Sequence, residues 1–168
     1  ERIKAIREKQ LRYFKSGATL DISGRKQRLR DFKEAVLKWE KPLCDALWKD
    51  LHKSYEEAYL TEISILLGEI DTHIRRWARP ERKRTPLKLF PSSSKVISEP
   101  LGNALIIAPW NYPVQLLLNP LVGAISAGCT ATLKPSPYVP TVSKVIEEMI
   151  SSTFEEDYIG VVQGNRVV

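Results

Sequence analysis

Apolar residues in the first 80 positions recur at intervals of three and four, which is the spacing of one face of an α-helix. This pattern predicts four helices, over residues 3–15, 23–39, 42–51 and 55–79. The last helix has the most regular spacing, with apolar side chains at Leu60, Ile63, Leu67, Ile70, Ile74 and Trp77. We therefore expect the N-terminal half of the chain to be helical.

Residues that favour helix starts support these boundaries. Asp21 or Ser23 can cap the second helix, because a short polar side chain accepts hydrogen bonds from the free backbone N–H groups of a first turn. Pro42 suits the first turn of the third helix. Ser54, followed three positions later by Glu57, is a candidate capping box for the fourth.

The hydrophobic pattern changes at Gly102. Short apolar runs bounded by turn residues predict buried strands, and amphipathic stretches between them predict helices. The strands span residues 103–108, 130–134 and 159–163, and the helices span residues 114–127 and 140–153. Strands that alternate with helices form a parallel sheet with right-handed connections. We therefore predict an α/β fold in which the N-terminal helices pack on this sheet.

Polar side chains follow two of the predicted strands. Pro109 and Pro113 end the first strand and stiffen the turn around Asn111, and Lys134 ends the second strand. Ligands bind at the carboxyl ends of neighbouring parallel strands. An amide there can donate to a developing oxyanion, and an ammonium can contact phosphate or hydroxyl groups. A purely structural interpretation, in which Asn111 closes a turn and Lys134 ends a strand, fits these patterns equally well.

Charge is distributed unevenly along the chain. The net charge of +6 combines +8 in the first 100 residues, from 23 Lys and Arg against 15 Asp and Glu, with −2 in the rest. Acids alternate with these bases on the predicted helices, as in Lys53 with Glu57, which favours solvated helix surface and no nucleic-acid partner. Arg82-Lys83-Arg84 is a weak basic signal, and we assign it to a solvated loop.

Composition predicts a globular protein of a reducing compartment. The apolar content of 43% suffices for a core, and no apolar run is long enough to predict a membrane span. The charged N-terminus does not resemble a signal peptide. The two cysteines, Cys44 and Cys129, are 85 positions apart, which favours free thiols and a cytoplasmic location. We expect Cys44, on an apolar helix face, to be a small core residue.

Several common catalytic and binding motifs are absent from the sequence. It contains no glycine-rich dinucleotide fingerprint, no P-loop and no Gly-x-Ser-x-Gly nucleophile elbow. His52 and His73 each lack a second ligand at metal-binding spacing, so we expect no metal site. The residues with the clearest chemical potential are therefore Asn111 and Lys134.

The strand ends belong to longer segments that resemble the NAD(P)-dependent aldehyde dehydrogenases. The matching segments are residues Glu99–Gly102, Ile106–Pro113, Asn119–Gly128 and Leu133–Ser136. The Pro-Trp-Asn-Tyr-Pro and Leu-Lys-Pro-Ser pair at this spacing is highly specific. Ser16-Gly17 and Tyr59–Ile63 resemble the class 3, fatty-aldehyde-type branch. The resemblance covers nearly the whole chain and implies the first half of a Rossmann-like sheet.

This resemblance also implies site residues. Asn111 matches the asparagine whose amide stabilises the oxyanion, and Lys134 matches the lysine that contacts the adenosine ribose. Tyr112 would stand near the substrate tunnel. The implied cofactor-binding residues are Ala108, Pro109, Trp110, Lys134, Ser136 and Pro137. The implied cofactor is NAD or NADP, and the implied substrate is an aldehyde.

The family mechanism needs further residues. A cysteine thiolate attacks the aldehyde, the thiohemiacetal gives hydride to the nicotinamide, and water activated by a glutamate hydrolyses the thioester. The resemblance puts that cysteine and glutamate beyond the point that matches Val168, and neither Cys44 nor Cys129 is suited to replace the cysteine. We therefore expect the N-terminal part of an oxidoreductase, without turnover by residues 1–168 alone. The alternative is a non-catalytic scaffold or interaction module.

One position departs from the family pattern. After Leu-Lys-Pro-Ser the family often has a glutamate, which binds the ribose hydroxyls and repels a 2′-phosphate, and this chain has Pro137. The loss of a carboxylate there should ease NADP binding, so we predict use of both cofactors or a weakened preference for NAD.

Three parts follow from the resemblance. Residues 1–80 would form a helical layer of the cofactor-binding domain, and residues 101–168 its first β-α-β-α-β unit. Residues 81–100 would extend towards an oligomerisation domain, which implies a homodimer.

Overall fold

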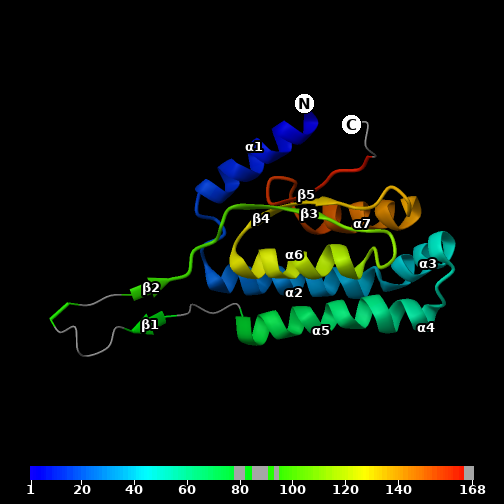
Figure 1. The fold of residues 1–168 in the computed structure, drawn as a ribbon, viewed down its shortest axis with the longest axis horizontal. Helices are drawn as coiled ribbons and strands as arrows, with labels where there is room; N and C mark the ends of the chain where they lie inside the picture. Colours follow the sequence, from blue (N-terminus) through cyan, green and yellow to red (C-terminus); the bar gives the residue numbers. More distant parts are fainter. Residues whose placement is uncertain (78–81, 85–90, 93–94, 165–168) are drawn as a thin grey trace.

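The computed structural model describes residues 1–77, 82–84, 91–92 and 95–164 (Figure 1). The helical N-terminal part comprises α1 (Arg2–Lys15), α2 (Ile22–Lys38), α3 (Glu40–Leu51), α4 (Tyr55–Ala58), the π-helical turn η1 (Tyr59–Ile63), α5 (Ser64–Thr72) and a second π-helical turn, η2 (His73–Trp77). The rest comprises β1 (Arg82–Arg84), β2 (Lys95–Ile97), β3 (Asn103–Ile107), α6 (Gln115–Ala127), β4 (Thr130–Lys134), α7 (Pro140–Thr153) and β5 (Ile159–Val161).

The fold is α/β, as the alternating pattern predicts. Strands β3, β4 and β5 form a parallel sheet with β4 in the centre. Helix α1 covers one face of this sheet, whereas α6 and α7 cover the other, and α2 and α5 lie beyond them as an outer helical layer (Figure 1). The core therefore lies between the sheet and these helices, where β4 is buried along most of its length.

Most predicted element boundaries agree with the structure within one or two residues, because short-range patterns determine them. Asp21 caps α2 by accepting from the backbone N–H groups of Ser23 and Gly24. Ser54 caps α4 by accepting from the N–H of Glu57, which is one half of the predicted capping box. The third helix begins at Glu40, two residues before Pro42, and the proline still lies in the first turn, where its missing N–H leaves no helical hydrogen bond unmade.

The predicted apolar face of the fourth helix is partly wrong. Leu60 is 64% exposed, and the residues that are buried instead include Ala58, Glu62 and Leu66. The π-helical turn η1 explains the difference, because its wider turns interrupt the regular period of 3.6 residues that the prediction assumed. The predicted end of this helix, near Arg79-Pro80, lies outside the described residues.

The solvated loop assigned to residues 82–84 is also wrong. These residues form β1, which pairs antiparallel with β2. The two strands lie away from the main body of the molecule (Figure 1). These residues are ordered by backbone pairing with a segment 13 positions away. The basic composition of residues 82–84 does not indicate that pairing.

Helix α1 approaches the sheet closely at β5. A side chain on Gly160 would come within 3.3 Å of both Ile6 and Gln10, which are the two buried residues of α1. Gly160 therefore allows the helix to pack against the strand without an intervening side chain.

Candidate functional site

The carboxyl ends of β3 and β4 lie side by side. Ile107, the last residue of β3, is paired with Lys134, the last residue of β4. The N–H of Ala108 donates to the carbonyl of Lys134 at 3.2 Å, which extends the pairing one residue beyond β3. The backbone after β3 and the side chain of Lys134 therefore begin at the same edge of the sheet.

The turn after β3 leads directly into α6. Ala108 is buried, Pro109 and Trp110 are exposed, and Asn111 is also exposed. Tyr112 is 37% exposed, so part of its ring is accessible. The side chain of Asn111 is therefore available to a ligand from the strand-end edge.

The segment after β4 presents a mixture of groups. Lys134 is half-buried, and its ammonium donates to the carbonyls of Gly164 at 2.7 Å and Pro135 at 3.4 Å. An ammonium has three N–H groups, and these are its two hydrogen bonds among the residues that the structure describes. Ser136 is buried and Pro137 is exposed. The structure thus places the Asn111 and Lys134 segments at one edge, and neither side chain is sealed inside apolar packing.

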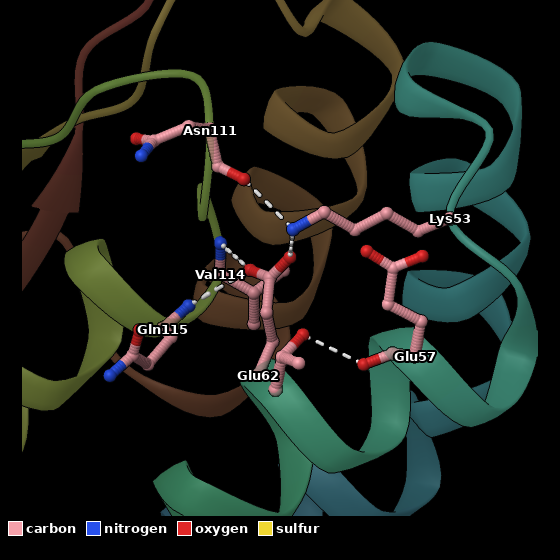
Figure 2. Close-up of polar contacts among 7 residues, drawn as sticks. Lys53, Glu57, Glu62, Asn111, Val114 and Gln115 are labelled. Atoms are coloured by element: carbon pink, nitrogen blue, oxygen red, sulfur yellow. Dashed lines mark hydrogen bonds and ion pairs between the residues drawn. The ribbon is translucent and has the colours of Figure 1, made fainter.

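A buried ion pair lies beneath the Asn111 turn, and the sequence reasoning missed it. The ammonium of Lys53 is 2.7 Å from Oε1 of Glu62 and donates to the backbone carbonyl of Asn111 at 2.8 Å (Figure 2). Glu62 is fully buried and Lys53 is 8% exposed. The pair joins the segment after α3 and the π-helical turn η1 to the turn that follows β3.

The second oxygen of Glu62 binds the start of α6. Oε2 accepts from the backbone N–H of Val114 at 2.8 Å and from that of Gln115 at 3.2 Å. Val114, the N-cap residue of α6, makes no side-chain cap. The first N–H groups of a helix lack partners unless another group caps them. A carboxylate also interacts favourably with the positive end of the helix dipole. Glu62 therefore caps α6 from a different part of the chain.

The expected pairing of Lys53 with Glu57 on a solvated surface is wrong. Lys53 points into the protein and pairs with Glu62 (Figure 2). The only local signal is the series Ala58, Glu62, Leu66, spaced by four, which puts the carboxylate on a face with small and apolar residues. The partners of the Lys53–Glu62 pair, at residues 111–115, are remote in sequence, so spacing alone does not reveal them.

Lys53 also contacts the ring of Tyr112. Its ammonium lies 3.9 Å from the ring centroid, within the range of a cation–π interaction. The same cation therefore contacts both the backbone of Asn111 and the side chain of the next residue.

Neither cysteine resembles a nucleophile. Cys44 and Cys129 are both free and buried. Burial, with a smaller contribution from the charge of Glu40, raises the pKa of Cys44 to about 11. A nucleophilic cysteine needs the thiolate, which a raised pKa disfavours. Cys44 is therefore a core residue, as the sequence predicts.

Across the residues that the structure describes, no three His, Cys, Asp or Glu side chains gather as a metal ion would require. His73 contacts Glu69 at 3.1 Å. Among the helices that the structure describes, none combines the length and the apolar character that crossing a bilayer requires.

Comparison with known proteins extends these observations. The sequence model of the Aldehyde dehydrogenase family matches residues 1–168. The chain is 44% identical over 155 residues to 4,4′-diaponeurosporen-aldehyde dehydrogenase of Staphylococcus aureus, covering 90% of this chain and 34% of the relative. It is 36% identical over 154 residues to aldehyde dehydrogenase family 3 member F1 of Arabidopsis thaliana, covering 90% and 32%. The chain thus spans about a third of the length of these relatives.

Solved structures share the fold. The substrate-bound state of Staphylococcus aureus AldH superposes with a TM-score of 0.93 at 42% identity, covering 97% of this chain and 36% of that one. A Staphylococcus aureus betaine aldehyde dehydrogenase in complex with NAD⁺ gives 0.83 at 23% identity, covering 95% and 32%. GapN from Methanocaldococcus jannaschii, a glyceraldehyde-3-phosphate dehydrogenase complexed with NADP, gives 0.77 at 20% identity, covering 96% and 36%. The last two show likeness of fold alone.

Proposed function

Because this chain belongs to the aldehyde dehydrogenase family, we propose that it is the N-terminal part of an enzyme that oxidises aldehydes to carboxylic acids with NAD or NADP. The observation that carries the proposal is the pair of polar segments at adjacent strand ends, with Asn111 exposed and Lys134 half-buried. A class 3 relationship agrees with the Arabidopsis thaliana relative.

Asn111 would act on the carbonyl oxygen of the substrate. Its side-chain amide is a neutral donor that does not lose a proton. It can therefore stabilise the oxyanion that forms when a nucleophile adds to an aldehyde. Because both cysteines of the chain are buried and the pKa of Cys44 is raised, we propose that the nucleophile belongs to a part of the enzyme outside these 168 residues. Residues 1–168 alone would then have no turnover.

The residues after β4 suit a nucleotide. NAD or NADP, when bound, would accept the hydride from the substrate carbon. Lys134 makes two carbonyl contacts among the described residues, and its ammonium has the charge and the donor groups that suit a ribose hydroxyl or a phosphate oxygen. The neighbouring strand end, that of β3, would place Ala108, Pro109 and Trp110 beside the cofactor. The cofactor would also lie beside Ser136 and Pro137, which follow Lys134 in the chain.

We also propose that Pro137 relaxes cofactor choice. Pro137 is exposed, and it offers neither a carboxylate to bind the ribose hydroxyls nor a negative charge to repel a 2′-phosphate. Substitution of Pro137→Glu should therefore lower the affinity for NADP relative to NAD. Dissociation constants of both cofactors, measured for the two proteins by fluorescence titration, test this. Strict NAD selectivity of the natural protein would contradict it.

The name of one relative supports a class of substrate for this proposal. The Staphylococcus aureus relative is named for 4,4′-diaponeurosporen-aldehyde, so we propose an aldehyde of that class, with Tyr112 near its path. We further propose a cytoplasmic homodimer, to which residues 81–100 contribute.

The test uses the longer protein that would carry this chain. Purified protein should reduce NAD or NADP when an aldehyde is added, and Asn111→Ala should lower kcat about 100- to 1,000-fold. Aldehyde-dependent cofactor reduction is followed by absorbance. If the protein binds other subunits but shows neither cofactor binding nor aldehyde-dependent cofactor reduction, its function is that of a non-catalytic scaffold.

A further inference from the structure

We propose that Lys53 and Glu62 are positioning residues that hold the Asn111 turn in its working geometry from the buried side. The proposal rests on the proposed function, because it assigns these residues an effect on catalysis through Asn111. Neither side chain is itself placed to contact substrate, since both are buried beneath the turn.

The two polar groups of Asn111 point in different directions. Its backbone carbonyl points towards Lys53, whereas its side-chain amide points away from the ion pair (Figure 2). The two groups share one Cα, so the ammonium that binds the carbonyl also restricts where the amide can point. Lys53 thus acts on the amide without touching it.

The pair of Lys53 and Glu62 holds the turn at both ends. Lys53 binds the carbonyl of Asn111 at 2.8 Å, and Glu62 binds the N–H groups of Val114 and Gln115 at 2.8 and 3.2 Å. Lys53 and Glu62 are joined to each other at 2.7 Å. Residues 111–115 are therefore held by a single connected network in which each group has charged or backbone partners.

The network of Lys53 and Glu62 is buried. Interactions among charged and backbone groups are stronger away from water, and removal of one partner leaves the others buried without compensation. The network therefore restricts the turn more tightly than exposed pairs would. Because catalytic groups must be held to within a fraction of an ångström of the productive geometry, loosening this turn would reduce transition-state stabilisation before it reduced cofactor binding.

A double-mutant cycle in the longer protein tests the proposal. Lys53→Met keeps the apolar stem and removes the ammonium, and we expect it to lower kcat about tenfold or more, as loss of a supporting contact commonly does. In an Asn111→Ala background the same substitution should change kcat by less than about twofold, because the group it positions is gone. The KM for the cofactor should stay within about twofold of the parent value in both backgrounds.

A matched control separates positioning from general loss of an ion pair. Lys33 contacts Asp71 at 2.8 Å between α2 and α5, and both side chains are about one-third exposed, so Lys33→Met breaks a pair away from the strand-end edge. We expect its kcat to stay within about twofold of the parent. Equal losses of kcat from Lys53→Met in the parent and in the Asn111→Ala background would overturn the positioning role while leaving the proposed function intact.

A structural measurement keeps the proposal testable even if the enzyme shows no turnover. The side-chain amide NMR signals of Asn111, and hydrogen exchange at Val114 and Gln115, should change in Lys53→Met or in the volume-conserving Glu62→Gln, and should not change in Lys33→Met. Unchanged signals in both variants of the pair would overturn the proposal. Absence of turnover in the parent protein, with the expected NMR changes, would refute the proposed function and with it the effect on catalysis, while the pair would still be shown to hold the Asn111 turn.

Discussion

Gln10 is the side chain that joins α1 to the sheet. It is fully buried, and its Nε2 donates to the carbonyls of Ala131 at 2.7 Å and Glu156 at 3.2 Å. Its Oε1 accepts from Asn103 at 2.6 Å and from the hydroxyl of Thr132 at 2.7 Å. Both amide hydrogens and both lone pairs are therefore occupied, which is the full capacity of a glutamine.

Substitution of Gln10→Ala should lower the free energy of unfolding by about 2–4 kcal/mol, because it leaves several buried polar groups without partners. Gln27→Ala is the control, since Gln27 forms an exposed contact with Asp31, and its effect should stay within about 0.5 kcal/mol. Urea denaturation measures both. Equal effects of the two substitutions would contradict the importance of burial.

Cys44 makes stability depend on pH in the alkaline range. Its pKa is raised from an ordinary value of 9.0 to about 11, mainly because the thiolate would be buried. The folded state then holds this proton more tightly than the unfolded state. The contribution of the thiol to stability is therefore present below about pH 9 and is lost at up to about 1.4 kcal/mol per pH unit towards pH 11.

Comparison with Cys44→Ala checks this sign. The natural protein should lose more unfolding free energy than the variant when denaturation is measured at rising pH across that window. Parallel curves for the two proteins would mean that Cys44 titrates equally in the folded and unfolded states.

At the scale of elements, α3 supplies the missing cap of α7. Oδ2 of Asp50 accepts from the N–H groups of Thr141 at 2.8 Å and Val142 at 2.9 Å, whereas the N-cap residue Val139 makes no side-chain cap. Asp50 thereby ties the N-terminal helices to the helix that follows the segment carrying Ser136 and Pro137. Glu62 does the same for α6, so both helices that cover one face of the sheet begin on carboxylates from the N-terminal part.

Asp50→Ala should lower the free energy of unfolding by about 1–2 kcal/mol, the usual effect of losing a helix cap. Asp45→Ala on the same helix removes only an exposed contact with Lys41 and should change it by about 0.5 kcal/mol or less. Thermal unfolding distinguishes the two. An Asp45 effect as large as that of Asp50 would argue against capping between elements.

In the whole molecule, α1 leaves part of its face of the sheet exposed, and this part is apolar. Leu105 and Ile107 are 64% and 66% exposed, and they follow Asn103 on the same side of β3 because side chains alternate along a strand. Strand β3 is also at the edge of the described three-stranded sheet. Exposed apolar residues on an edge strand favour association.

Residues 1–168 in isolation should therefore associate in solution, and Leu105→Glu with Ile107→Glu should reduce this association. Light scattering over a range of protein concentrations measures the effect, with Leu20→Glu as a control at an exposed site outside the sheet. A monomer at every concentration would contradict the prediction.

Local patterns were sufficient where neighbouring residues determine the structure. The strand over residues 130–134 and the helix over residues 140–153 were predicted with the bounds that the structure has, because period, turn residues and a first-turn proline all agree there. Prediction failed at Leu60 and at residues 82–84, where a π-helical turn and an antiparallel partner override local preference. The roles of Asn111, Lys134 and Pro137 stay predictions.

The α/β order and the two polar segments after β3 and β4 can be predicted from residues close together in the chain, and the family can be predicted from several short segments that match its pattern. Only the tertiary structure decided that Lys53 and Glu62 are partners beneath Asn111. Their contacts join positions up to 58 residues apart, and burial of the pair depends on how the helices pack against the sheet. No local spacing contains that information, since it arises from which surfaces exclude water together.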